Sequence, residues 1–465
     1  LLQAPPPALN DPVARAAAAL GSDRARSAAA RLRASHKGSY FAQEQARSPA
    51  SPTATVGRLL RWQFDVEKQR LIRDADQMFP DGIHFSNRAA IDGDSGWSVD
   101  LLGWRTGDDE QRFGREESIA SRLQFERFFP HLLMRQALAS RSVERVAPSQ
   151  FQFRDEAGTL IEVLLDPATG RPSRAAQIVD GKRQLELAYS DYHRRHGVMM
   201  PRRLQLFQAQ RLQEDLTLGR TTIAPIARTS LTPPPGYRPK PTAGTPSARE
   251  LAAGIWVFDN MPGDYHSLAI DMGDHLMLVE APLNPGYADL QKKILAELRP
   301  SKAVRAVLVT HHHGDHNGGL ARWAEAGATI IVARGAKVAI ERQLRARGFA
   351  GRAMIEEIKT HHRFGSRRAV DVYAFDSLHV EAHLLVHLPD PQILFQGDLF
   401  YLPERGAVPT AFGGARELQK QIAQRGLKVR TVVGVHGRPG TIGDLRQSLR
   451  QSGRAGATRD VHLAP

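Results

Sequence analysis

The stretch T-H-H-H-G-D-H-N-G-G, residues 310–319, places four candidate metal ligands within six residues: His311, His313, Asp315 and His316. Residues 303–309 just before it are rich in aliphatic and β-branched side chains, which predicts a buried strand. Alternate side chains of an extended segment share a face, so His311 and His313 can reach one metal ion together. Asp315 and His316 follow around a turn and can reach a second ion. Imidazole and carboxylate ligands favour zinc, with iron or manganese as alternatives.

A run of histidines can also be an exposed polar tract. This run is not terminal, and it lies between a predicted strand and a predicted helix that begins at Leu320. Aspartate and glycine stand at fixed offsets within it, and glycine allows the backbone to fold tightly around an ion. We therefore interpret the stretch as a metal-binding loop.

The pattern T-H-x-H-x-D-H-x-G-G resembles the signature of the metallo-β-lactamase superfamily. The resemblance covers roughly Ala252 to Gly440. It implies an α/β fold, an αββα sandwich, with a dinuclear metal site at one edge. It also implies hydrolysis by a hydroxide that bridges two metal ions.

The resemblance implies three further ligands, each at the end of a strand. One metal ion would bind His311, His313 and His379, the other would bind Asp315, His316 and His436, and Asp398 would bridge them. The choice of His379 is the least direct, because D-S-L-H-V-E-A-H-L-L-V-H-L-P (residues 376–389) also contains His383 and His387. His379 opens this segment, and Ala382 stands where the family has glycine. His383 is the alternative ligand and is otherwise expected inside the following strand.

Two residues are predicted to act in catalysis. Asp315 can take or pass a proton, in addition to binding metal. Tyr401 follows Asp398 by three residues, an offset that resembles that of a substrate-binding tyrosine in acyl-homoserine lactonases. A phenol there can support an oxyanion, and the alternative is a tyrosine that only packs. The ligand set is similar to that of glyoxalase II and lactonase relatives, and it contains no cysteine.

Composition and charge limit the kinds of molecule that the chain is expected to bind. The 465-residue chain has no cysteine, a net charge of +14, 42% hydrophobic and 24% charged residues, which is typical of a globular protein. No apolar run approaches the ~20 residues of a membrane span. The arginines that carry the charge are scattered, so we expect a small-molecule substrate rather than nucleic acid. Only about sixty residues separate His316 from His379, which leaves little room for a nuclease-type insertion. The sequence leaves open whether the chain forms a homo-oligomer.

The chain begins Leu1-Leu2-Gln3-Ala4-Pro5 without methionine. A removed signal peptide or a trimmed sequence would both explain this start. We expect a periplasmic or secreted protein, with the cytoplasm as the alternative.

The remaining sequence predicts further regions before the metal-binding one. We expect a helical segment over residues 1–50, a β-rich N-terminal domain over 51–232, a proline-rich linker over 233–250 and the catalytic domain over 251–465. The N-terminal domain is expected to be α+β and mainly antiparallel, forming a curved sheet or partial barrel. It would cover, orient or dimerise the catalytic domain, or hold an apolar ligand.

Together these features predict a zinc-dependent hydrolase with two Zn²⁺ per chain. The expected substrate is a small ester, lactone, thioester or β-lactam-type carbonyl compound. Two alternatives are a metal- and ligand-binding module without turnover and a phosphodiesterase or nuclease.

Overall fold

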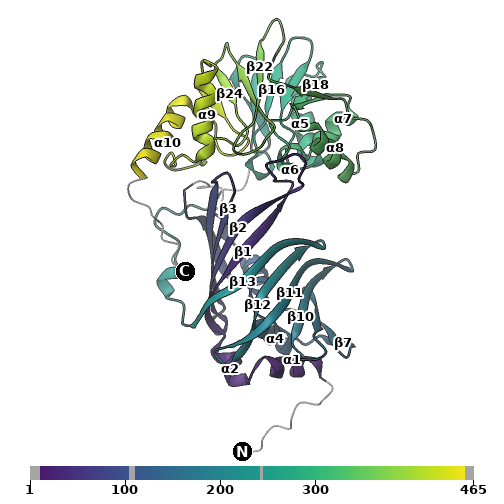
Figure 1. The fold of residues 1–465 in the computed structure, drawn as a ribbon, viewed down its shortest axis with the longest axis vertical. Helices are drawn as coiled ribbons and strands as arrows, with labels where there is room; N and C mark the ends of the chain where they lie inside the picture. Colours follow the sequence, from purple (N-terminus) through teal and green to yellow (C-terminus); the bar gives the residue numbers. More distant parts are fainter. Residues whose placement is uncertain (1–10, 104–109, 241–243, 456–465) are drawn as a thin grey trace, which may run out of the picture.

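The structure is a computed structural model that describes residues 11–103, 110–240 and 244–455. It contains one large antiparallel sheet in the N-terminal half and two packed sheets in the C-terminal half (Figure 1). We call these the N-terminal sheet and the C-terminal sandwich. In the described ranges, no helix is long and apolar enough to cross a membrane.

The N-terminal sheet has 13 strands and is built from two meanders. The first comprises β1 (Arg31–Gln43), β2 (Thr53–Asp65), β3 (Arg70–Met78), β4 (His84–Asp92), β5 (Ser95–Asp100) and β6 (Arg112–Phe113). The second comprises β7 (Val143–Ala147), β8 (Gln150–Arg154), β9 (Leu160–Leu165), β10 (Pro172–Val179), β11 (Lys182–Arg195), β12 (Val198–Gln208) and β13 (Arg211–Ile223). Antiparallel pairing of β1 with β13 joins the meanders into one sheet.

Short helices cover part of this sheet. They are α1 (Pro12–Leu20), α2 (Asp23–Ala28), α3 (Arg115–Glu126) and α4 (Pro130–Ala139). Helix α1 packs against α4, and both contact β12. Phe128 and Phe129, which lie between α3 and α4, are buried, and Phe125 packs against the same core. The mainly antiparallel N-terminal fold predicted from the sequence is therefore confirmed.

The prediction of a helical segment over residues 1–50 is wrong for the residues after Ala28. The described part has helix only in α1 and α2, and from Arg31 the chain forms β1; residues 1–10 lie outside the described ranges. In β1 the side chains of Leu32, Ala34 and His36 are buried and their neighbours face outward. This period of two identifies a strand, and pairing with the adjacent β2 and the distant β13 outweighs the high helix propensity of the alanines upstream.

The proline-rich stretch 233–250 is only partly a linker. Strand β14 (Ser247–Ala252) begins inside it, because it pairs with β15 (Ile255–Asp259), and residues 241–243 lie outside the described ranges. Tyr237 packs against Trp97, and its hydroxyl donates to the carbonyl oxygen of Gln111 at 2.6 Å. The first part of the linker therefore lies along the N-terminal sheet.

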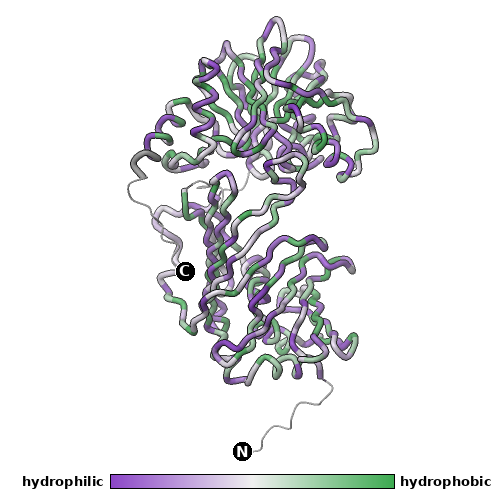
Figure 2. Tube along the Cα trace, in the orientation of Figure 1, coloured by the Kyte–Doolittle hydropathy of each residue, from purple (hydrophilic) through white to green (hydrophobic). Residues whose placement is uncertain are grey.

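The C-terminal sandwich has the predicted αββα layers. The seven-stranded sheet continues from β14 and β15 with β16 (Leu268–Asp271), β17 (Leu276–Val279), β18 (Val304–Leu308), β19 (Thr329–Ala333) and β20 (Ile355–Ile358). The six-stranded sheet has β21 (His361–Phe364), β22 (Val370–Phe375), β23 (His383–Leu388), β24 (Ile393–Phe395), β25 (Thr431–Val433) and β26 (Gly440–Thr441). Figure 2 shows hydrophobic segments along the strands of this sandwich.

Helices cover the outer faces of both sheets. Helices α5 (Pro285–Leu298), α7 (Leu320–Glu325) and α8 (Lys337–Ala346) lie on one side, with the single-turn α6 (Gly314–Asn317) at the edge. Helices α9 (Gly413–Gln424) and α10 (Ile442–Ala455) lie on the other side (Figure 1). The core between the sheets includes Phe258 and Phe395, both fully buried.

The loop between β1 and β2 contacts the sandwich next to α6 (Figure 1). The amide of Gly314 donates to the carbonyl oxygen of Glu44 at 3.0 Å, and the amide of Glu381 donates to that of Arg47 at 3.0 Å. A Cβ atom at position 314 would overlap the Glu44 side chain, so this close approach requires glycine. The N-terminal sheet therefore reaches the histidine-rich loop directly.

Candidate metal centre

The histidine-rich loop follows β18, which pairs in parallel with β17 and β19. Two amide side chains fix the loop. Asn317 donates to the carbonyl oxygens of His312 (3.1 Å) and His313 (2.7 Å), and Gln343 donates to that of His312 (2.8 Å). Buried Glu280 accepts the backbone N–H of Thr310 at 2.9 Å. These bonds hold the loop backbone without using the imidazoles of His311 and His316.

The first cluster consists of His311, His313 and His379, whose possible ligand atoms all lie within 4.8 Å of one another. Nε2 of His311, Nδ1 of His313 and Nε2 of His379 are buried and have no hydrogen-bond partner among the described residues. Buried polar atoms are normally satisfied, so three converging unpaired nitrogens fit a cation. The donor set matches the three-ligand arrangement that catalytic zinc uses.

The second cluster consists of Asp315, His316 and His436, again within 4.8 Å. Nε2 of His436 lies 3.4 Å from Oδ2 of Asp315. Each of the three side chains comes from the end of a strand or the turn after it, because β18 precedes the loop and β25 precedes His436. A carboxylate and two imidazoles also fit a divalent cation.

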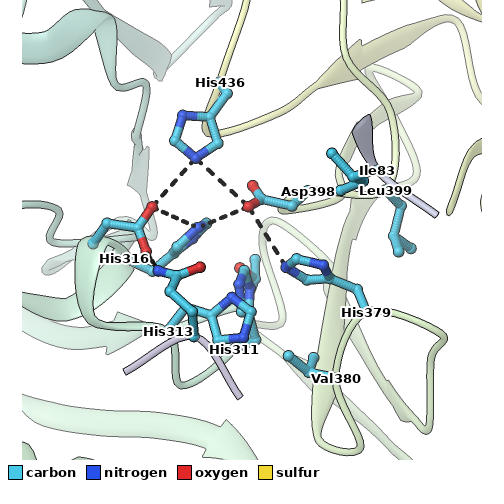
Figure 3. Close-up of polar contacts among 12 residues, drawn as sticks. Ile83, His311, His313, His316, His379, Val380, Asp398, Leu399 and His436 are labelled. Atoms are coloured by element: carbon cyan, nitrogen blue, oxygen red, sulfur yellow. Dashed lines mark hydrogen bonds and ion pairs between the residues drawn. The ribbon is translucent and has the colours of Figure 1, made fainter. Parts of the chain in front are cut away.

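Asp398 lies between the two clusters (Figure 3). Its Oδ2 is 3.2 Å from Nε2 of His316, 3.5 Å from Nε2 of His436 and 3.7 Å from Nε2 of His379, while its Oδ1 has no partner among the described residues. Gly397 precedes it with φ of 66° and packs against Thr310, so the turn that presents Asp398 needs glycine. This position suits a carboxylate shared by two ions.

The imidazoles of the site fall into two groups by the direction in which their pKa values are shifted. Burial, with neighbouring rings, holds the pKa values of His311 and His313 well below the ordinary value, so both are neutral. Burial also lowers the pKa values of His316 and His436, but the carboxylates of Asp398 and Asp315 outweigh this effect. They raise the pKa of His316 well above its usual value and that of His436 to about 9. Cations would replace the protons of these two rings, since metal binding releases protons.

His379 and His383 occupy different environments. His379 lies in the loop after β22, and its Nδ1 is 2.7 Å from Oδ2 of Asp81. His383 is the first residue of β23, with Nε2 hydrogen-bonded to the carbonyl oxygen of Gln396 (3.0 Å) and Nδ1 3.3 Å from Oγ of Ser377. His387 likewise bonds the carbonyl oxygen of Lys428. The structure thus brings His379 to the cluster and leaves the other two in the strand.

Several residues at the site have no local sequence pattern. The side-chain amide of Gln45 donates to Oδ1 of Asp315 at 2.6 Å, and the hydroxyl of Tyr265 donates to Oδ2 at 3.0 Å. Burial and the Asp315 carboxylate raise the pKa of Tyr265 above its ordinary value. Ala46 presents its carbonyl oxygen to Nε2 of His313 at 3.2 Å. Two of these residues come from the β1–β2 loop.

Tyr401 lies beside the site. Its ring is buried and stacks on His436, with centroids 5.7 Å apart and planes 16° from parallel. Its place near Asp398 agrees with the expected location, and its catalytic role stays a prediction.

The two clusters line a cavity of about 350 Å³. Asp315, His379, Asp398 and His436 form its floor with Tyr265 and Tyr401. The rest of the lining comes from the N-terminal sheet: Tyr40, Ala42, Gln43, Gln45, Gln77, Phe79, Ile83 and Phe85. Cavities of about 440 and 620 Å³ elsewhere contain none of the seven candidate ligands.

The comparisons with known proteins concern the C-terminal sandwich. Residues 262–436 match the family model described as the metallo-beta-lactamase superfamily. This match places a metallo-β-lactamase superfamily domain within the C-terminal sandwich and indicates a metal-dependent hydrolase. No curated protein matches the chain.

Solved structures similar to the chain include three metallo-β-lactamases. The one from Pontibacter korlensis is 19% identical, covers 45% of this chain and 99% of its own, and has a TM-score of 0.35. FIM-1 from Pseudomonas aeruginosa, in its mono-zinc form, is 15% identical, covers 46% and 98%, and scores 0.36. The enzyme from Hirschia baltica is 19% identical, covers 44% and 97%, and scores 0.34.

Proposed function

We propose that the chain is a zinc-dependent hydrolase with two Zn²⁺ per chain that cleaves a small ester, lactone, thioester or β-lactam-type carbonyl compound. The observation that carries this proposal is the position of Asp398 between two clusters of three candidate ligands each. When bound, two ions would lower the pKa of a shared water so that it becomes a nucleophile, and would polarise the substrate carbonyl.

The protein's own residues would supply orientation and proton transfer. Gln45 and Tyr265 hold the two oxygens of Asp315, so this carboxylate is fixed where it can accept or pass a proton. Tyr401 lines the floor of the cavity, where its phenol can donate to the carbonyl oxygen as negative charge develops. Burial of the ligands excludes bulk water and strengthens these interactions.

A substrate panel tests the proposal. Purified full-length protein, loaded with two equivalents of zinc, is assayed against an aryl ester, a lactone, a thioester, a β-lactam and a phosphodiester. Metal-free protein and protein carrying Asp398→Asn serve as controls. We expect zinc-dependent hydrolysis of at least one carbonyl substrate.

Two results would contradict it. Zinc binding without turnover of any substrate would favour a binding module. Turnover of the phosphodiester alone would favour the nuclease alternative.

A further inference from the structure

The wall of the cavity opposite the metal ligands belongs to another part of the molecule. Eight of the fourteen residues that line the cavity lie in the N-terminal sheet or in the loops that connect its strands. They come from the end of β1, the loop after it and the β3–β4 hairpin. The metal ligands form only the floor of the cavity. A substrate whose reacting carbonyl lies on that floor would therefore place the rest of its atoms against these eight side chains.

The β3–β4 hairpin contributes an apolar surface. Phe79 and Phe85 face each other edge to face, with centroids 5.9 Å apart and planes at 86°. Ile83 lies between them in the sequence and lines the same cavity as Asp398 (Figure 3). All three side chains are half-buried, so they offer apolar area that a ligand can cover. Tyr40 and Ala42 extend this surface from β1.

The hairpin is fixed relative to the ligands. The amide of Phe79 donates to the carbonyl oxygen of Ile83 at 2.8 Å, and Oδ1 of Asp81 accepts the amide of Ile83 at 3.1 Å. The other oxygen of Asp81 contacts His379. One side chain thus ties the turn to a candidate metal ligand and holds the apolar wall next to the candidate site.

The polar part of the wall is neutral. Gln43, Gln45 and Gln77 supply side-chain amides, and no lysine or arginine is among the lining residues in the described ranges. Three nearby arginines already have acidic partners: Arg58 pairs with Glu214, Arg347 with Glu44, and Arg47 with Glu381. An anionic substituent that lies against this wall, away from the metal ligands, would lose hydration and meet no lysine or arginine among the lining residues.

We propose that the substrate is an uncharged acyl compound with an apolar group, and that the N-terminal sheet selects it. This inference rests on the proposed hydrolase function. The apolar group lies against Phe79, Ile83 and Phe85, and the glutamine amides bind neutral polar atoms of the same molecule. The N-terminal sheet is therefore part of the substrate site of the C-terminal sandwich.

Hydroxamic acids test this directly, because the hydroxamate binds zinc whether or not the molecule is a substrate. Affinities of the zinc-loaded full-length protein are measured by calorimetry for acetohydroxamate, hexanohydroxamate and succinic acid monohydroxamate. Each methylene that enters the apolar wall should tighten binding about fourfold. We expect hexanohydroxamate to bind at least about tenfold tighter than acetohydroxamate, and the carboxylated compound no tighter than acetohydroxamate.

Three substitutions test whether the apolar residues of the β3–β4 hairpin cause this difference in affinity. Phe85→Ala should lower the ratio of hexanohydroxamate to acetohydroxamate affinity several-fold. Ile83→Lys should reverse the order and favour the carboxylated compound, a gain that misfolding cannot produce. Phe207→Ala, at a half-buried phenylalanine in β12 beside a different cavity, is the matched control and should leave the ratio unchanged.

Equal affinity for the two alkyl compounds, or tightest binding of the carboxylated one to the unaltered protein, would overturn the inference while leaving the hydrolase proposal intact. Acetohydroxamate binding together with zinc-dependent ester hydrolysis tests the hydrolase proposal itself. Absence of both would overturn the proposed function and this inference with it.

Discussion

Asp81 in the β3–β4 hairpin contacts His379 of the C-terminal sandwich, with 2.7 Å between Oδ2 and Nδ1, although 298 positions separate the two residues. A hydrogen on Nδ1 that bonds the carboxylate leaves the Nε2 lone pair directed towards His311 and His313. Carboxylates that orient metal-binding histidines in this way also raise their basicity. The N-terminal half of the chain therefore contacts a ligand of the candidate metal centre directly.

Asp81→Asn should weaken zinc binding by about 10- to 100-fold. The amide keeps Oδ1, which accepts the Ile83 amide and maintains the turn, but presents an NH₂ group to Nδ1 of His379. Zinc affinity is measured by competition with a chelator. Asp94→Ala, in the exposed β4–β5 turn, is the control and should not change affinity. Equal affinities of wild type and Asp81→Asn would show that the contact does not position His379.

Zinc stoichiometry should distinguish His379 from His383. His379→Ala leaves one cluster with only two imidazoles, fewer than the three protein ligands of catalytic zinc, so about one equivalent of zinc should be lost. His383→Ala removes a ring bonded to Gln396 and Ser377 and should retain both equivalents at reduced stability. Metal analysis of both variants after dialysis decides the matter. The opposite pattern would show that the ligand assignment is wrong by four residues.

Asp398→Asn should lose more activity than metal. The amide keeps the shape but removes the negative charge that Asp398 places among His316, His379 and His436. We expect kcat to fall by at least about 100-fold, which is more than the loss of a residue that only hydrogen-bonds a metal ligand usually causes. The zinc ion of the cluster that contains Asp315 should be lost first. Kinetics and metal content are measured on the same sample. Full activity with two retained ions would exclude a bridging role.

Much of the site was predictable because it is local in the sequence. His311, His313, Asp315 and His316 stand within one loop, and Asp398 and His436 each follow a short apolar strand. Strand ends on the same edge of a sandwich meet, but the assignment of these residues to two ligand sets rests on the resemblance to the metallo-β-lactamase superfamily.

Gln45, Asp81 and Tyr265 were not predictable in this way. Their contacts with His379 and Asp315 depend on how the N-terminal sheet lies on the sandwich, and no local pattern encodes that. A related reason explains why the sequence predicts helix where β1 forms, because its pairing with the distant β13 is not encoded locally.

A buried histidine in the N-terminal sheet should make stability depend on pH. Burial lowers the pKa of His36 to about 3, and its Nδ1 accepts the indole N–H of Trp62 at 3.1 Å. The unfolded chain protonates near pH 6.5 and the folded chain does not, so stability falls as pH drops from about 6.5 towards 3, by up to ~1.4 kcal/mol per pH unit. His36→Gln should reduce the slope of urea midpoints between pH 7 and 5. His362→Gln, on exposed β21, should not, and equal slopes for wild type and His36→Gln would contradict this role.

The most direct test of the dinuclear hydrolase is a zinc titration of activity. Metal-free protein receives increasing zinc, and the initial rate of hydrolysis of a neutral acyl ester is measured at each ratio. The rate should rise and reach a plateau at two equivalents per chain, since Asp398 lies between two complete clusters. Full activity before zinc is added, or a plateau at one equivalent, would contradict the account.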